Sequence, residues 1–259
     1  MKVLLAIVTV VVLAGSATAQ SPAAQPTAPA GVGGVLDALP NLAKPAAAGQ
    51  MLQWIVLVTV LSLVPAVLVM VTSFTRIMVV LGLLRQALAT QQLPPNQVLM
   101  ALSLFMSLVI MAPVYTQAYQ QGVGPYLAGQ MDGPTALAGA QGPVRAFMIG
   151  QLQAAHNEQD VLLFIPADLA GRQGLAWGQV PTLSLIPAFI VSELKVAFAI
   201  GLRIFLPFVV IDLLVSAVLV SMGMLMLPPV LVSMPFKLLL FVLADGWHLV
   251  VGTLLRSFQ

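Results

Sequence analysis

The chain has 259 residues, of which 60% are hydrophobic and only 7% are charged. A soluble domain usually carries about 25% charged residues, so this composition is typical of a membrane protein. The net charge of +2 is too small to indicate nucleic-acid binding, and the absence of cysteine excludes a disulfide framework and a thiolate metal site.

Residues 1–19 have the pattern of a secretory signal peptide. Lys2 supplies the positive end, residues 3–13 are an apolar core, and residues 17–19 (Ala-Thr-Ala) form a small-residue cleavage site. The alternative is an uncleaved first transmembrane helix, but the core is shorter than the ~20 residues that a crossing needs. We therefore expect an exported mature N-terminus, followed by a flexible leader over residues 20–50, which are rich in Ala, Pro and Gly.

Residues 51–114 are expected to form a first apolar helical hairpin. Residues 51–75 contain no charge and are long enough to cross a bilayer, and residues 98–114 form the second apolar span. Arg76 and Arg85 fall between the two spans. Basic residues favour the cytoplasmic side, so both are predicted to anchor a cytoplasmic loop, in agreement with an exported N-terminus.

Residues 115–182 differ from the rest because they combine charged residues with many Gly, Gln and Pro. We expect a small, mainly helical polar domain outside the cytoplasm. Its best helical candidate is residues 144–163, where apolar residues recur at a near-helical spacing.

Residues 183–259 are expected to form a second apolar hairpin, with a Met-rich loop at residues 222–229 that ends in Pro228-Pro229. Its first tract, residues 183–227, would run about 65 Å as a helix, roughly twice the ~30 Å core of a bilayer. This tract must therefore kink or extend beyond the membrane.

Six charges lie inside this second hairpin: Glu193, Lys195, Arg203, Asp212, Lys237 and Asp245. A charge at a helix centre in lipid costs ~2.5–3.5 kcal/mol, so these residues should face protein or water. Glu193 and Lys195 are two residues apart and point to different sides of one helix, so they should not pair with each other. Most of the six lack a partner on their own helix, which indicates partners on other helices or other subunits and favours an oligomer.

Three roles stay open for these charges: interhelical ion pairs, snorkelling at helix ends, and a proton relay through Glu193, Asp212 or Asp245. An aspartyl dyad of Asp212 and Asp245 is imaginable, but no catalytic motif surrounds them. His156 and His248 are isolated. We expect no enzyme activity, no metal and no cofactor.

Three long segments are specific enough to compare with a known family: "SFTRIMVVLGLLRQALATQQLPPNQVLMALSLFMSLVIMAPV" (73–114), "IPAFIVSELKVAFAIGLRIFLPFVVIDLL" (186–214) and "GMLMLPPVLVSMPFKLLLFVLADGWHLVVGTL" (223–254). They resemble the flagellar biosynthetic protein P (FliP) family, and the resemblance covers most of residues 51–259. Homologues in type III injectisomes share these motifs. The signal sequence and long leader favour the flagellar branch.

The resemblance implies a core subunit of the type III protein export gate in the flagellar basal body at the bacterial inner membrane. About five copies of the chain would join FliQ and FliR in a right-handed helical ring of long kinked hairpins, around a pore for unfolded flagellar subunits. FlhB, FlhA and FliO are further implied partners. The complex would lie largely on the periplasmic side, so that its hairpins need not all span the bilayer.

The resemblance also implies residue roles. Met224, Leu225 and Met226 would form a gasket that closes the pore, although the family commonly has three methionines and Leu225 departs from this. Five charges of the second hairpin would hold subunits in register: Glu193, Lys195, Asp212, Lys237 and Asp245. Two other interpretations remain open: a proton-coupled carrier that uses intramembrane acids, and a scaffold whose pore lies elsewhere.

Overall fold

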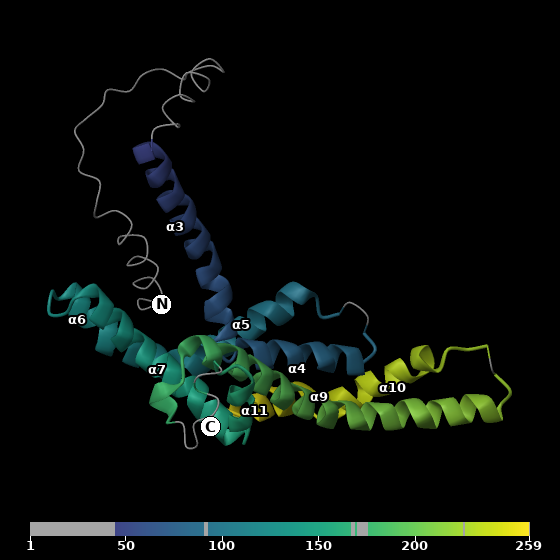
Figure 1. Ribbon diagram of the computed structural model, residues 1–259. Coiled ribbons are helices and arrows are strands. Elements are labelled where there is room, and N and C mark those ends of the chain that lie inside the picture. The colour runs from purple at the N-terminus through teal and green to yellow at the C-terminus, as the bar shows by residue number, and fades with distance from the viewer. Residues whose placement is uncertain (1–44, 91–92, 167–168, 170–175, 225, 259) are drawn as a thin grey trace, which may run out of the picture. The chain divides into compact units, whose positions relative to one another are not determined.

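The computed structural model describes residues 45–90, 93–166, 169, 176–224 and 226–258, and the regular elements within these ranges are all helical (Figure 1). The predicted all-α fold is therefore confirmed for this part of the chain. The elements are α3 (Pro45–Met70), α4 (Phe74–Ala87), α5 (Asn96–Ala118), a π-helical turn η1 (Tyr119–Val123), α6 (Gly124–Leu127), α7 (Gly133–Ala154), 3-10 turns η2 (Glu158–Leu163) and η3 (Trp177–Gln179), α9 (Thr182–Ser221), α10 (Pro229–Leu243) and α11 (Gly246–Arg256). The predicted signal peptide and most of the leader lie outside the described residues.

Contacts divide the chain into two units, Met1–Leu68 and Val69–Gln259. The described part of the first unit is most of α3, an apolar helix that begins at Pro45, before the expected start at residue 51. Apolar side chains such as Trp54, Ile55 and Val58 are exposed on it.

The predicted span over residues 51–75 is interrupted, because α3 ends at Met70 and α4 begins at Phe74. The short break contains the buried polar residues Thr72 and Ser73. The Ser73 hydroxyl donates to Ser107 Oγ of α5 at 3.0 Å. A tertiary hydrogen bond therefore accompanies a break that lacks glycine and proline.

Helix α4 packs along α9 and forms the main hydrophobic cluster of the second unit. Its buried face repeats at helical spacing through Ile77, Val80, Leu81 and Leu84. Gly201 of α9 permits a close approach of the two helices, because a Cβ at this position would collide with the side chain of Leu83.

Helix α9 is a single helix of 40 residues that contains Pro187 and Pro207. At 1.5 Å per residue it is about 60 Å long, so the expected overlong helix is present. A turn at Gly223, whose φ is 73°, reverses the chain into α10, which lies alongside α9 (Figure 1). Helix α10 ends before Asp245, and α11 is bent from it by 65°.

The segment predicted as a separate polar domain packs on the first part of α9. Met148 and Leu152 of α7 and Val161 of η2 share a second hydrophobic cluster with Leu185 and Phe189 of α9. The helix expected over residues 144–163 begins earlier, at Gly133, and ends at Ala154. The domain boundaries drawn from the sequence stay a prediction.

Two stretches within the described residues are long and apolar enough to cross a membrane. They are Asn96–Leu127, with α5 as its main part, and Thr182–Ser221, which is α9. The bent pair α10 and α11 gives a third if it is counted as one span.

Two glycines of α7 provide a matched test of the packing between α7 and η1. A Cβ at Gly139 would collide with the backbone carbonyl oxygen of Gln121, whereas a Cβ at Gly150 would meet no atom within 4 Å. Gly139→Ala should therefore lower the free energy of unfolding by about 1–3 kcal/mol. Gly150→Ala should raise it by up to about 1 kcal/mol, because glycine is a poor helix former. Thermal unfolding of the detergent-solubilised protein measures both, and equal effects would contradict the packing of α7 on η1.

Candidate functional site

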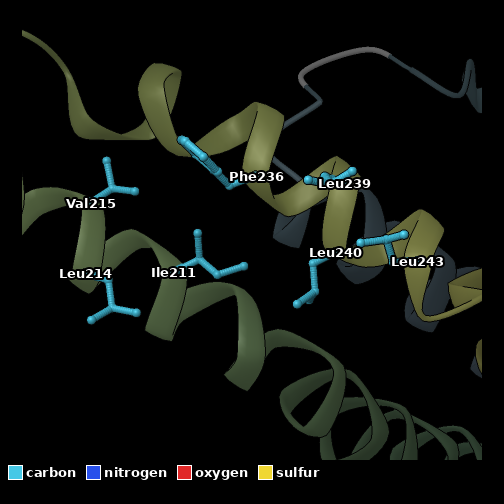
Figure 2. Close-up of a pocket in the computed structure, with 7 residues that line it drawn as sticks. All are labelled: Ile211, Leu214, Val215, Phe236, Leu239, Leu240 and Leu243. Carbon is cyan, nitrogen blue, oxygen red and sulfur yellow. The ribbon is translucent and has the colours of Figure 1, made fainter.

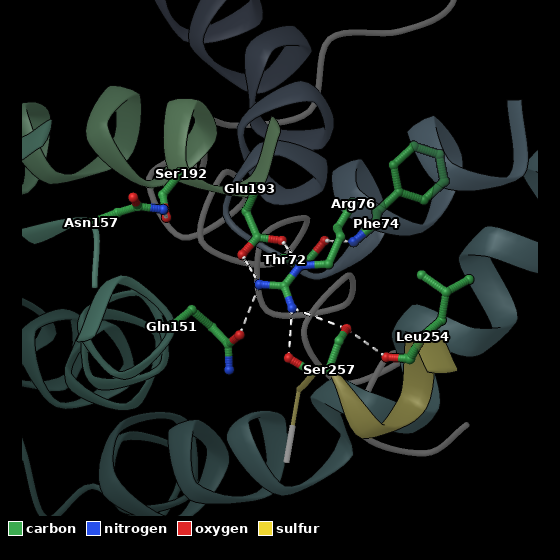
Figure 3. Close-up of polar contacts among 9 residues, drawn as sticks. All are labelled: Thr72, Phe74, Arg76, Gln151, Asn157, Ser192, Glu193, Leu254 and Ser257. Atoms are coloured by element: carbon green, nitrogen blue, oxygen red, sulfur yellow. Dashed lines mark hydrogen bonds and ion pairs between the residues drawn. The ribbon is translucent and has the colours of Figure 1, made fainter. Parts of the chain in front are cut away.

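A buried guanidinium lies where four segments of the chain meet (Figure 3). Arg76 of α4 is only 1% exposed, and Glu193 of α9 is fully buried. Arg76 Nε donates to Glu193 Oε2 at 2.8 Å, and Nη2 donates to Oε1 at 2.5 Å. This bidentate arrangement is the strong form of an arginine–carboxylate pair.

The other N–H groups of Arg76 bind α7 and the end of the chain. Nη2 donates to Gln151 Oε1 at 2.9 Å, and Nη1 donates to the carbonyl oxygen and Oγ of Ser257 at 2.7 and 3.1 Å. The guanidinium carbon lies 3.9 Å from the ring centroid of Phe258. All the donors of a guanidinium are thus satisfied. We call Arg76, Glu193, Gln151 and Ser257 the arginine centre.

The predicted position of Arg76 in a cytoplasmic loop is wrong, because the residue lies in the first turn of α4 and is buried. The apolar period of Ile77, Val80, Leu81 and Leu84 right after it was the sequence signal for this helix. Arg85 does lie near the connection from α4 to α5, and its Nη1 donates to Asn96 Oδ1 at 2.5 Å. Its cytoplasmic location stays a prediction.

A second ion pair joins the two helices of the α9–α10 hairpin. Lys237 Nζ of α10 donates to Asp212 Oδ2 of α9 at 2.7 Å, and Ser233 Oγ donates to Oδ1 of the same carboxylate at 2.5 Å. The Lys237 side chain is buried, and Asp212 is partly exposed. Both carboxylate oxygens are therefore occupied by donors from α10.

A third ion pair joins α9 to η2. Lys195 Nζ lies 2.5 Å from Asp160 Oδ1, and the lysine side chain is 53% exposed. The prediction that Glu193 and Lys195 do not pair with each other is confirmed, since each binds a different element. Asp160 itself is buried, and its second oxygen has no hydrogen-bond partner within the described residues.

Partners on other helices or on other subunits were expected for these charges, and four of the six have partners on other elements of the same chain: Glu193, Lys195, Asp212 and Lys237. Spacing along one helix did not reveal these partners because they lie on other helices. These four residues no longer argue for an oligomer. The other two, Arg203 and Asp245, are exposed, and neither takes part in the three ion pairs of the described residues.

The predicted gasket lies at the tip of the α9–α10 hairpin, where the chain turns between the two helices. Met224 is 39% exposed and Met226 is 98% exposed. Leu225 lies outside the described residues. Large apolar side chains are therefore presented at the tip, where the chain itself does not cover them.

An apolar groove of about 390 Å³ runs between α9 and α10 (Figure 2). Its lining comes from both helices and is entirely apolar: Ile211, Leu214, Val215, Phe236, Leu239, Leu240 and Leu243. The groove offers no polar group for a substrate. Within the described residues, no three His, Asp or Glu side chains gather as a metal site would require.

Comparison with known proteins gives consistent matches. The model of the FliP family matches residues 57–254. The flagellar biosynthetic protein FliP of Caulobacter vibrioides is 49% identical over 210 residues, which cover 81% of this chain and 77% of the relative. The FliP protein of Treponema pallidum is 47% identical over 80% of this chain and 75% of the relative. That of Bacillus subtilis is 45% identical over 79% of this chain and 90% of the relative. The resemblance inferred from the three sequence segments is therefore confirmed.

The arginine centre predicts strong coupling between Arg76 and Glu193. Arg76→Met leaves a buried carboxylate without its cation, so the free energy of unfolding should fall by about 3–5 kcal/mol. Arg76→Met combined with Glu193→Met should lose much less than the sum of the two single changes, because it leaves neither charge buried alone. Thermal and denaturant unfolding in detergent measure this cycle.

Arg85→Met is the matched control, since it makes the same change on the same helix but loses only hydrogen bonds to the neutral oxygens of Asn96 and Pro94. It leaves no buried charge unpaired and should cost about 1 kcal/mol. Additive losses from Arg76→Met and Glu193→Met would contradict the coupling. So would a loss from Arg85→Met as large as that from Arg76→Met.

Proposed function

The chain belongs to the FliP family, and on that premise we propose that it is a core subunit of the flagellar protein export gate. Several copies, about five, would assemble with FliQ and FliR into a ring around a pore that passes unfolded flagellar proteins across the inner membrane. FlhB, FlhA and FliO would be further partners. The role is one of structure and conduction and involves no catalytic residue and no cofactor.

The observation that carries this proposal is the exposed methionine tip of the α9–α10 hairpin. Apolar side chains exposed as fully as Met226 favour burial against another surface. A ring of hairpins would bring the tips of several copies together around an axis. Methionine is flexible and fills irregular gaps, so a ring of Met224 and Met226 could seal the pore at rest and conform to a passing chain. Leu225 would join this gasket as an apolar residue of similar volume.

The outer surface of the hairpin supports a location in the membrane region. Large apolar side chains are exposed along both α9 and α10, among them Leu206, Val210 and Leu239. At about 60 Å, α9 is also twice as long as the ~30 Å apolar core of a bilayer. A part of the helix would then extend beyond the lipid, which fits a ring that lies largely on the periplasmic side.

The internal ion pairs favour a gate over a proton-coupled carrier. A relay carboxylate must exchange protons with water, yet Glu193 is buried against Arg76 and the oxygens of Asp212 accept from Lys237 and Ser233. The curated relatives quoted above all carry a flagellar name, which favours the flagellar apparatus over an injectisome.

The assembly itself is tested by native mass spectrometry of the detergent-extracted complex, after co-expression of the full chain with FliQ and FliR. We expect one particle that contains several copies of this chain and both partners. A stable monomer or dimer that ignores FliQ and FliR would overturn the gate and favour the carrier.

The gasket is tested by the ion permeability of membranes that hold the assembled complex. Met224→Ala together with Met226→Ala should raise the ion leak several-fold, because shorter side chains open and wet the constriction. Met100→Ala is the matched control, since Met100 is an exposed methionine of α5 and lies outside the hairpin. If the complex assembles and its ion leak is unchanged, Met224 and Met226 only pack between helices and the pore lies elsewhere.

A further inference from the structure

We propose that Arg203 of one copy forms an ion pair with Asp245 of the neighbouring copy, across the face of the hairpin that carries the apolar groove. This inference rests on the proposed function in one respect, namely that several copies of the chain assemble. It identifies the contact that fixes the level of one hairpin against the next.

The first observation is that these two charges remain after the other charges from α9 to the bend into α11 are paired. Among the described residues, Glu193, Asp212 and Lys237 have partners on other helices of the same chain. Arg203 and Asp245 are opposite in sign, are exposed, and occur in none of the three ion pairs. Between the start of α9 and the bend into α11, each copy therefore offers one cation and one anion outside these pairs. Two neighbouring copies can pair them without any other chain.

The second observation is that the two residues lie at the same level of the hairpin. Asp212 binds Lys237, and one turn towards Arg203 the rings of Phe208 and Phe241 pack with centroids 6.5 Å apart. Helix α10 ends at Leu243, and Asp245 follows it by two residues, so Asp245 lies near the level of Ile204, the neighbour of Arg203 in the sequence. Neighbouring hairpins at a similar height would thus place Arg203 beside Asp245.

The third observation is that only one of the two charges lies on the face that carries the groove. Leu214 follows Arg203 by three helical turns, so it shares the face of Arg203, and it lines the groove. Asp245 instead follows the end of α10, at the bend into α11, and is not among the residues that line the groove. A cation on the groove face and an anion outside it suit a head-to-tail contact, the kind that repeats around a ring.

Asp245 is also held in place. It begins α11 with a left-handed backbone (φ 48°), and a Cβ on the following Gly246 would collide with the Phe241 ring. A neighbouring hairpin that covers the groove would exclude water beside Arg203, and an arginine without a carboxylate there would be costly.

Disulfide cross-linking tests the contact directly, because the chain has no cysteine. Two full-length versions with different tags, one with Arg203→Cys and one with Asp245→Cys, are co-expressed with FliQ and FliR and oxidised. We expect a dimer that carries both tags and disappears on reduction. Arg203→Cys with Thr253→Cys is the matched control, since Thr253 is also exposed but lies two turns further along α11, and it should give no such dimer.

Charge exchange gives a second readout that does not depend on cysteine. Arg203→Asp and Asp245→Arg should each reduce the multi-copy particle several-fold in native mass spectra, and the double exchange should restore it.

If the unmodified chain assembles but neither the mixed dimer nor the rescue occurs, the ion pair is wrong while the gate stands. If the unmodified chain forms no multi-copy particle, the proposed gate fails and the contact fails with it.

Discussion

The fold depends on one constraint, that the guanidinium of Arg76 is buried and must have its charge and its N–H groups satisfied. Isolated charges are too costly in a low-dielectric interior, so the surrounding segments have to deliver acceptors to one point. Glu193 supplies the carboxylate, while Gln151 and Ser257 supply neutral oxygens. In this way α4, α7, α9 and the end of the chain are fixed against one another, and the packing of the apolar faces of α4 and α9 is held in one register.

From this centre the α9–α10 hairpin extends as an arm, and a separate ion pair joins its two helices. The pair of Asp212 and Lys237, with Ser233, joins the two helices well beyond the arginine centre, and Phe208 and Phe241 pack one turn away. The polar groups inside the arm thus satisfy one another. What the arm presents outward is apolar, namely the groove and the methionine tip, together with the exposed charges Arg203 and Asp245. An arm of this kind is suited to contact with other chains.

Much of this organisation could be predicted from the sequence, because long apolar tracts and their turns follow from composition and period. The helical class, the overlong α9, the turn before Pro228-Pro229 and the lack of pairing between Glu193 and Lys195 were all accessible. The break at Thr72 and Ser73 was not, because it contains neither glycine nor proline and coincides with a hydrogen bond to Ser107, which is a tertiary contact. Arg76 was misplaced for a related reason: a basic residue after an apolar run indicates a loop on the cytoplasmic side, but its carboxylate partner lies far along the chain at Glu193.

The partners of the charges could not be found from spacing, because periodicity describes one helix and these pairs join different helices. This limit also shows why the case for assembly had to change. Unpaired charges first suggested an oligomer, and most of them prove to be paired inside the chain. The stronger argument is length: α9 is about 60 Å long, and a bilayer core of ~30 Å can cover only about half of it. Its exposed apolar residues continue from Phe198 to Val220, so whatever part lies outside the lipid needs another protein surface to remove it from water.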